Sequence, residues 1–275
     1  MPTQSCARTL LILLIAISPG GVAGAEEEDA QAREEFRRFF ATAGVGFDYS
    51  TGDYGESVTT DVYSPSLFVK LEYEPPLPWE LAVPLTFKVF VPYVVIDGPA
   101  DVIPGEGATT VLSEPASQRH GIGDIVASLA YTYYPREKFV PIVDVFTKVK
   151  IPSASTSKSI GTGHADVTFG FELFEQFGPV GVFGGGGYRI KGGGEYHDIW
   201  LASAGAQVSF GSRASLGLAY DFRQASTDGV GNSHELVPYV SFRLTDHLLL
   251  SPYGVIGLST NAPAWGLGGS FVVNF

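Results

Sequence analysis

The residues of this chain best suited to catalysis or metal binding are its histidines and one Ser-His-Glu triplet. Five histidines lie near the ends of strand-like segments: His120, His164, His197, His234 and His247. No two have the spacing that metal ligands on one strand require, so we predict no metal site. Consecutive residues of a strand point to alternate faces, so Ser233-His234-Glu235 cannot form a catalytic relay by itself. We therefore predict no catalytic residues and no enzyme, and keep a lipid-modifying enzyme as an alternative.

Two short glycine motifs could suggest a phosphate-binding loop. They are Gly121-Ile-Gly123 and Gly161-Thr-Gly163. A phosphate-binding loop needs a helix after the glycines, with backbone amides that point at the anion. Strand-like sequence follows here, which favours a turn that leads into a strand. We predict no nucleotide and no other cofactor.

The clearest structural signal is an alternation of apolar and polar residues between positions 120 and 151. Ile125, Ala127 and Leu129 share one parity, and the pattern resumes after the polar turn at 135–138. A period of two is typical of a β-strand, and two such runs joined by a tight turn predict an antiparallel hairpin. One face of this hairpin is apolar and the other carries charge.

The same alternation continues through the chain in about twelve segments. The predicted strands are 41–50, 58–74, 79–96, 121–134, 139–151, 164–176, 180–190, 197–210, 213–223, 234–245, 247–258 and 264–275. Short turns, including the one predicted at Pro75–Pro78, alternate with longer connections, of which 97–120 is the longest. An even strand number with short turns at one end and long loops at the other is typical of outer-membrane barrels. We predict an all-β, membrane-spanning, antiparallel up-and-down barrel.

Charged residues gather on one parity of the predicted strands and apolar residues on the other. We expect the charged set to line the lumen: Lys70, Glu72, Lys88, Asp124, Asp144, Lys148, Lys150, Asp166, Glu172, Arg189, Asp221, Arg223 and Arg243. A soluble two-sheet sandwich also alternates, but it spreads its charges over its outer surface. Aromatic residues near strand ends, such as Tyr49, Trp200 and Trp265, and glycines inside strands favour the barrel.

The first 25 residues have the features of a secretory signal peptide. Arg8 precedes the apolar run 10–17, and Ala23-Gly24-Ala25 matches a cleavage site. An uncleaved anchor is the alternative, but this run is too short to span a bilayer. Cys6, the only cysteine, would be removed with the signal, which excludes disulfides and thiolate metal sites. We assign residues 1–25 to the signal, 26–40 to a periplasmic leader, or alternatively a plug or docking helix, and 41–275 to the barrel.

The charge balance and the C-terminus bear on the partners of the chain. Its 29 acidic and 17 basic residues give a net charge of −12, which makes nucleic acid a poor partner. The last strand ends in Phe275. This ending resembles the C-terminal signal that the insertion machinery of bacterial outer-membrane proteins reads. We therefore expect outer-membrane lipid and this machinery as partners.

Three motifs narrow the resemblance further. They are Gly121-Ile-Gly123-Asp124, Lys148-Val-Lys150-Ile-Pro152 and Gly161-Thr-Gly163-His-Ala-Asp166. In this order they resemble the outer-membrane transporter family called "MetA pathway of phenol degradation". The chain has Pro152-Ser153-Ala154 where that family usually has Pro-Thr-Gly. The resemblance implies a barrel in the bacterial outer membrane, through which small, often aromatic or hydrophobic, compounds pass.

The predicted function is passive passage of such a solute through the lumen. A twelve-stranded barrel has a backbone diameter of roughly 24 Å, between filled eight-stranded barrels and wide porins. The inward charges either neutralise one another or select solutes by charge. The inward aromatics Phe90, Phe146, Phe183 and Tyr239 either contact an apolar solute or fill space. A structural or adhesion barrel that acts through its loops is a further alternative.

Overall fold

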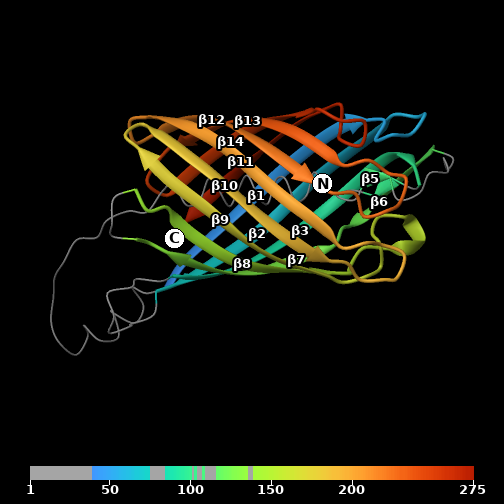
Figure 1. Ribbon diagram of the computed structural model, residues 1–275, viewed down its shortest axis with the longest axis horizontal. Helices are drawn as coiled ribbons and strands as arrows, with labels where there is room; N and C mark the ends of the chain where they lie inside the picture. Colours follow the sequence, from blue (N-terminus) through green and yellow to red (C-terminus); the bar gives the residue numbers. More distant parts are fainter. Residues whose placement is uncertain (1–38, 75–83, 101, 104–106, 109–115, 136–138) are drawn as a thin grey trace.

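The computed structural model describes residues 39–74, 84–100, 102–103, 107–108, 116–135 and 139–275 (Figure 1). The strands of this part are β1 (Phe39–Gly52), β2 (Thr60–Tyr73), β3 (Leu85–Pro99), β4 (Val102–Ile103), β5 (Gly107–Ala108), β6 (Ala116–Ile122), β7 (Ile125–Tyr133), β8 (Ile142–Ile151), β9 (Asp166–Phe177), β10 (Val180–Ile190), β11 (Ile199–Phe210), β12 (Ala214–Arg223), β13 (Ser233–Arg243), β14 (Leu248–Gly257) and β15 (Trp265–Asn274). A 3-10 turn, η1 (Thr156–Lys158), lies between β8 and β9. No helix in the described part of the chain is long and apolar enough to span a membrane.

The main sheet closes on itself. β1 pairs with β2 on one side and with β15 on the other, and strands that are adjacent around the wall pair antiparallel. β6 and β7 both pair with β3 and together form one wall strand. The wall therefore has twelve strands, and the predicted antiparallel up-and-down barrel is confirmed. β4 and β5 form a separate two-stranded sheet.

The strand formed by β6 and β7 contains a β-bulge. Tyr93 of β3 pairs with Ile122, and Phe90 pairs with Val126, so Val91 and Pro92 lie opposite three residues, 123–125. The Gly123 amide donates a hydrogen bond of 2.9 Å to the Pro92 carbonyl. The extra residue changes which parity faces inward: odd residues do so in β6 and even residues in β7.

The structure moves several predicted boundaries. β3 extends to Pro99 and β6 begins at Ala116, so much of the predicted loop 97–120 is strand. The physical reason is Arg119, whose guanidinium donates hydrogen bonds to the carbonyls of Gly98, Pro99 and Val102. β1 begins at Phe39, before the predicted start of the barrel at 41. The predicted signal peptide, most of the predicted leader and the predicted turn Pro75–Pro78 lie outside the described residues.

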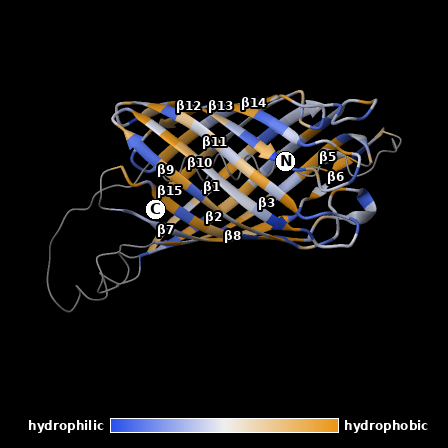
Figure 2. Ribbon diagram, viewed as in Figure 1, coloured by the Kyte–Doolittle hydropathy of each residue, from blue (hydrophilic) through white to orange (hydrophobic). Residues whose placement is uncertain are grey.

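The two faces of the wall differ sharply in polarity. Outward side chains are large and apolar, and Leu67 and Trp200 are 61% and 60% exposed. Inward positions hold buried charged residues, such as Lys88 at 4% and Arg189 at 1% exposure. Figure 2 shows hydrophobic and hydrophilic residues interspersed along the wall strands. This arrangement excludes the soluble sandwich, because a sandwich would bury its apolar face and expose its charges.

Outward tyrosines near the long-loop end each bond a polar neighbour. The Tyr49 hydroxyl donates to Asp61 at 2.9 Å and the Tyr188 hydroxyl to Asp198 at 3.0 Å. Two further tyrosines pair with histidine Nδ1 atoms, Tyr93 with His120 and Tyr220 with His234. Amphipathic rings held in this way are typical of the level where a barrel leaves the hydrocarbon.

Candidate functional site: the barrel interior

The thirteen predicted lumen residues all lie at inward positions of the wall. Eight of them are buried: Lys70, Lys88, Asp144, Lys150, Asp166, Glu172, Arg189 and Arg223. The other five are half-buried: Glu72, Asp124, Lys148, Asp221 and Arg243. Apart from Asp124, which lies in the bulge between β6 and β7, each belongs to a wall strand.

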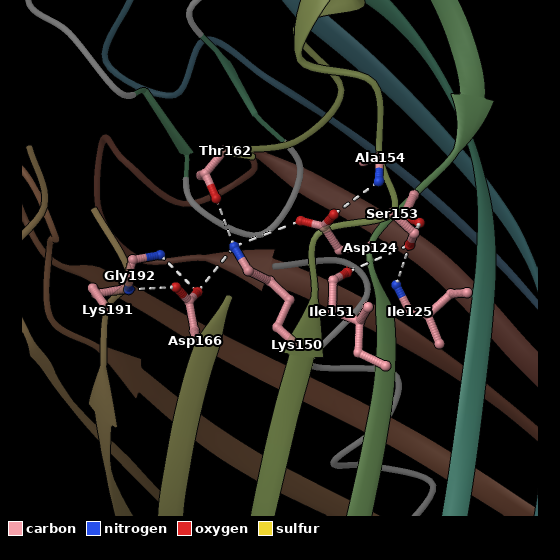
Figure 3. A network of polar contacts seen from close by, with 11 residues as sticks. Asp124, Ile125, Lys150, Ile151, Ser153, Ala154, Thr162, Asp166, Lys191 and Gly192 are labelled. Atoms are coloured by element: carbon pink, nitrogen blue, oxygen red, sulfur yellow. Dashed lines mark hydrogen bonds and ion pairs between the residues drawn. The ribbon is translucent and has the colours of Figure 1, made fainter. Parts of the chain in front are cut away.

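The structure brings three of these residues together at the long-loop end (Figure 3). Lys150 Nζ lies 2.9 Å from Asp166 Oδ2 and 3.5 Å from Asp124 Oδ2. Lys191, which sequence reasoning missed because it follows β10, also lies 2.9 Å from Asp166 Oδ2. We name these four residues the charge network. Since each charge has a partner of opposite sign, the network meets the condition under which buried ions are tolerated.

The charge network also holds two loops. Asp166 Oδ1 accepts a hydrogen bond of 3.1 Å from the Gly192 amide, in the loop after β10. Lys150 Nζ donates to Thr162 Oγ1 at 2.8 Å, in the loop before β9. The network therefore ties both loops to the ends of β8 and β9.

A second group of inward charges lies toward the tight-turn end. Lys70 forms an ion pair with Glu72 on the same face of β2. Lys70 and Lys88 are opposite each other in the β2–β3 register, and Lys88 Nζ lies 4.8 Å from the centre of the Phe68 ring. Asp144 and Glu172 are likewise opposite each other between β8 and β9. The basic pair on β2 and β3 and the acidic pair on β8 and β9 give this end charge of both signs.

A large apolar cluster also lies among the inward side chains. Its buried members come from seven strands and are Phe68, Phe90, Phe183, Ala219, Val237, Tyr239, Leu249, Tyr253, Val255 and Val272. Of the aromatics predicted to face inward, Phe90, Phe183 and Tyr239 belong to this cluster, and Phe146 is buried outside it. Phe68 and Tyr253 were missed, although both lie on the inward parity.

Five inward aromatic rings lie against glycines that pair with them on the neighbouring strand. We call these ring–glycine pairs: Phe68 with Gly44, Phe146 with Gly170, Phe183 with Gly205, Tyr239 with Gly217, and Tyr253 with Gly268. A Cβ placed on any of these glycines would collide with the ring opposite. The glycines therefore leave room for each ring against the neighbouring strand. Knowing the pairing register would have revealed them; the sequence alone does not give it.

Side chains from the loops cover the interior near β1 and β12–β15. Tyr54, in the β1–β2 loop, is buried and its hydroxyl lies 2.9 Å from Ser50 Oγ. Burial raises the pKa of the Tyr54 phenol above its usual value. Asn261 of the β14–β15 loop lies where side chains on Gly55 and Gly231 would be, so it joins three loops. These three loops therefore pack against one another at the long-loop end.

The barrel wall separates the members of the Ser233-His234-Glu235 triplet. Ser233 and Glu235 face inward and share a hydrogen bond of 2.8 Å, whereas His234 lies on the outer side and pairs with Tyr220. Ser233, His234 and Glu235 thus do not form a relay. Within the described residues, no group of three or more His, Cys, Asp or Glu side chains could hold a metal ion.

Comparison with known proteins relates this fold to membrane barrels. No family model matches the sequence, and no curated protein matches it. The structure is similar to an outer membrane channel from Pseudomonas putida F1, with a TM-score of 0.66 at 13% identity, over 94% of this chain and 100% of that chain. It is also similar to the translocator domain of the autotransporter NalP from Neisseria meningitidis, with a TM-score of 0.55 at 9% identity, over 90% and 94% of the two chains.

At these identities the likeness defines the fold: a membrane-spanning, outer-membrane type of β-barrel with twelve strands. The finer resemblance to the phenol-degradation family is not confirmed, because no family model matches.

Proposed function

We propose that this barrel is a channel in the bacterial outer membrane that passes a small solute without energy or a cofactor. The observation that carries the proposal is the inverted polarity of the wall, with large apolar side chains outside and charged residues inside. An apolar exterior fits lipid, and an interior with charges of both signs fits a polar path across it. The outer membrane channel from Pseudomonas putida, which covers 94% of this chain, supports the same proposal.

The apolar cluster supports a finer proposal, that the solute is aromatic or hydrophobic. The ring–glycine pairs set five buried aromatic rings along the inner wall, and an aromatic solute that displaces their neighbours would meet ring faces suited to offset stacking. Lys148, whose Nζ lies 4.2 Å from the centre of the Phe146 ring, places a cation beside one of these faces. Such a wall could guide a solute that has both an aromatic ring and a polar group.

Conductance and solute flux test the two levels of the proposal separately. The refolded protein in planar bilayers should give discrete current steps, and vesicles that contain it should take up small solutes. Uptake of an aromatic alcohol should exceed uptake of an aliphatic alcohol of equal mass, after correction for protein-free vesicles. Absence of both current and uptake would contradict the channel. Equal uptake of the two alcohols would leave the channel and remove the aromatic preference.

The proposed orientation places the tight turns in the periplasm and the long loops outside the cell. Phe275 is exposed at the tight-turn end, and its amide donates a hydrogen bond of 2.9 Å to the Ala41 carbonyl. This position fits our proposal that the insertion machinery recognises the last strand. Protease added to whole cells should then cut an epitope inserted at 227–229 and spare one inserted at 211–213. The reverse pattern would contradict the orientation.

A further inference from the structure

The loop between β8 and β9, residues 152–165, reaches across the wall at the long-loop end. Its residues Ala154 and Ile160 are buried against Val62, Val94 and Ile96, which face inward from β2 and β3. Since β7 lies between β8 and β3 in the sheet, the loop crosses over a neighbouring strand to make this contact. It thus covers part of the interior beside β2 and β3.

Side chains tie this loop to the bulge between β6 and β7. Ser153 Oγ accepts a hydrogen bond from the Ile125 amide and donates one to the Gly123 carbonyl, each of 2.9 Å. Asp124 Oδ1 accepts a hydrogen bond of 3.0 Å from the Ala154 amide (Figure 3). The bulge is thus the docking point for the start of the loop.

Further ties hold the second half of the loop. Lys150 of the charge network donates to Thr162, and Arg119 Nε donates to the Ser159 carbonyl at 3.1 Å. Ser159 and Gly163 have left-handed backbone conformations, with φ of 50° and 74°. Left-handed residues on either side of Thr162 are places where a loop can turn with small changes elsewhere.

We propose that residues 152–165 form a hinged cover over the long-loop mouth, held closed by Asp124 and Lys150. The apolar contact involves only Ala154 and Ile160 from the loop, so its closed state depends heavily on the polar ties. Release of the ties lets the loop leave β2 and β3 and widens the path into the interior. This proposal rests on the proposed channel function.

A single engineered thiol reports whether the cover opens. In a chain with Cys6→Ser, the change Ile160→Cys supplies the only thiol, at a position that is 3% exposed when the loop is closed. The probe is a negatively charged, membrane-impermeant thiol reagent. Adding Asp124→Ala removes the acceptor of the Ala154 amide and one partner of Lys150, and should speed labelling about tenfold or more. The same variant should carry a larger current per channel in planar bilayers.

Two further variants provide a control and a second, independent test of the cover. Asp144→Ala removes an inward carboxylate at the tight-turn end and should leave the labelling rate unchanged. Thr162→Val removes the hydroxyl that Lys150 contacts and should speed labelling even if Asp124→Ala does not fold, as judged by heat-dependent migration on a denaturing gel. Equal labelling rates in the parent and in folded Asp124 and Thr162 variants would overturn the cover. Faster labelling with unchanged current would overturn its role as a gate. Faster labelling without current in any variant would support the cover and count against the channel.

Discussion

Two parts of the inner wall bury different kinds of side chain. The part formed by β8, β9 and the residues after β10 buries ions, and Asp166 joins Lys150 and Lys191 there. The part formed by β12 to β15 buries rings, with Tyr239 over Gly217 and Tyr253 over Gly268. The first depends on complementary charge and the second on complementary shape. Substitutions should therefore break each part for a different reason.

The largest effect should come from Asp166→Ala in the charge network. This change leaves Lys150 and Lys191 buried without the carboxylate that they share, which typically costs about 3–5 kcal/mol of unfolding free energy. Urea unfolding of the refolded barrel, followed by tryptophan fluorescence, measures the loss. Combining Asp166→Leu with Lys191→Met should recover part of it, because an apolar pair replaces an ionic one. A loss below about 1 kcal/mol would mean that the network does not stabilise the wall.

An intermediate effect should follow from Gly217→Ala, in the ring–glycine pair that Gly217 forms with Tyr239. The new Cβ would occupy the space of the Tyr239 ring, and overpacking of this kind costs about 1–3 kcal/mol. Gly184→Ala is the matched control, since its Cβ would have no neighbour closer than 3.4 Å. A double-mutant cycle with Tyr239→Ala should show strong coupling between positions 217 and 239. Equal stabilities of the two glycine variants would refute the close fit.

A smaller effect should follow from Tyr239→Phe, which keeps the ring and removes its hydroxyl. The hydroxyl donates a hydrogen bond of 3.1 Å to Gln207 Oε1, and its loss should cost about 1 kcal/mol. Tyr253→Phe is the control, because the Tyr253 hydroxyl has no hydrogen-bond partner among the residues that the structure describes. The free energies of unfolding of the two variants, measured side by side, should differ in this direction. The opposite order would contradict a stabilising hydrogen bond from the Tyr239 hydroxyl.

The smallest effect near neutral pH should come from removing the hydroxyl of Tyr54, which is buried in the β1–β2 loop. Burial raises its phenol pKa in the folded chain above the ordinary value of 10.0. Its contribution to stability is therefore complete below pH 10.0 and is lost as the pH rises through the higher folded pKa. Tyr54→Phe should reduce the fall in unfolding free energy above pH 10.0. An unchanged alkaline slope in the variant would contradict a buried phenol at this position.

Strands, which repeat with a period of two along the chain, could be predicted from the sequence. Contacts that depend on which strands pair, and in which register, could not. The alternation of apolar and polar residues along the chain, as at Ile125, Ala127 and Leu129, sufficed to predict the strands of the barrel and their number. It could not supply the register, so the glycine opposite each ring, such as Gly205 opposite Phe183, was not foreseen. The cover was missed because Ile160 contacts Val94, far away in the sequence, through a loop without periodicity. Long-range contacts of loops leave no local pattern.

The bulge at 123–125 has a consequence for how this barrel tolerates change. The extra residue of the bulge lets odd residues of β6 and even residues of β7 face inward. A deletion of one residue there would turn the side chains of either β6 or β7 to the opposite face of the wall. Arg119 would turn toward lipid, or Ser128 and Thr132 would. Natural variation in this strand is thus expected as substitutions or as paired insertions and deletions, and alignment methods that assume an unbroken repeat will misassign one of its halves.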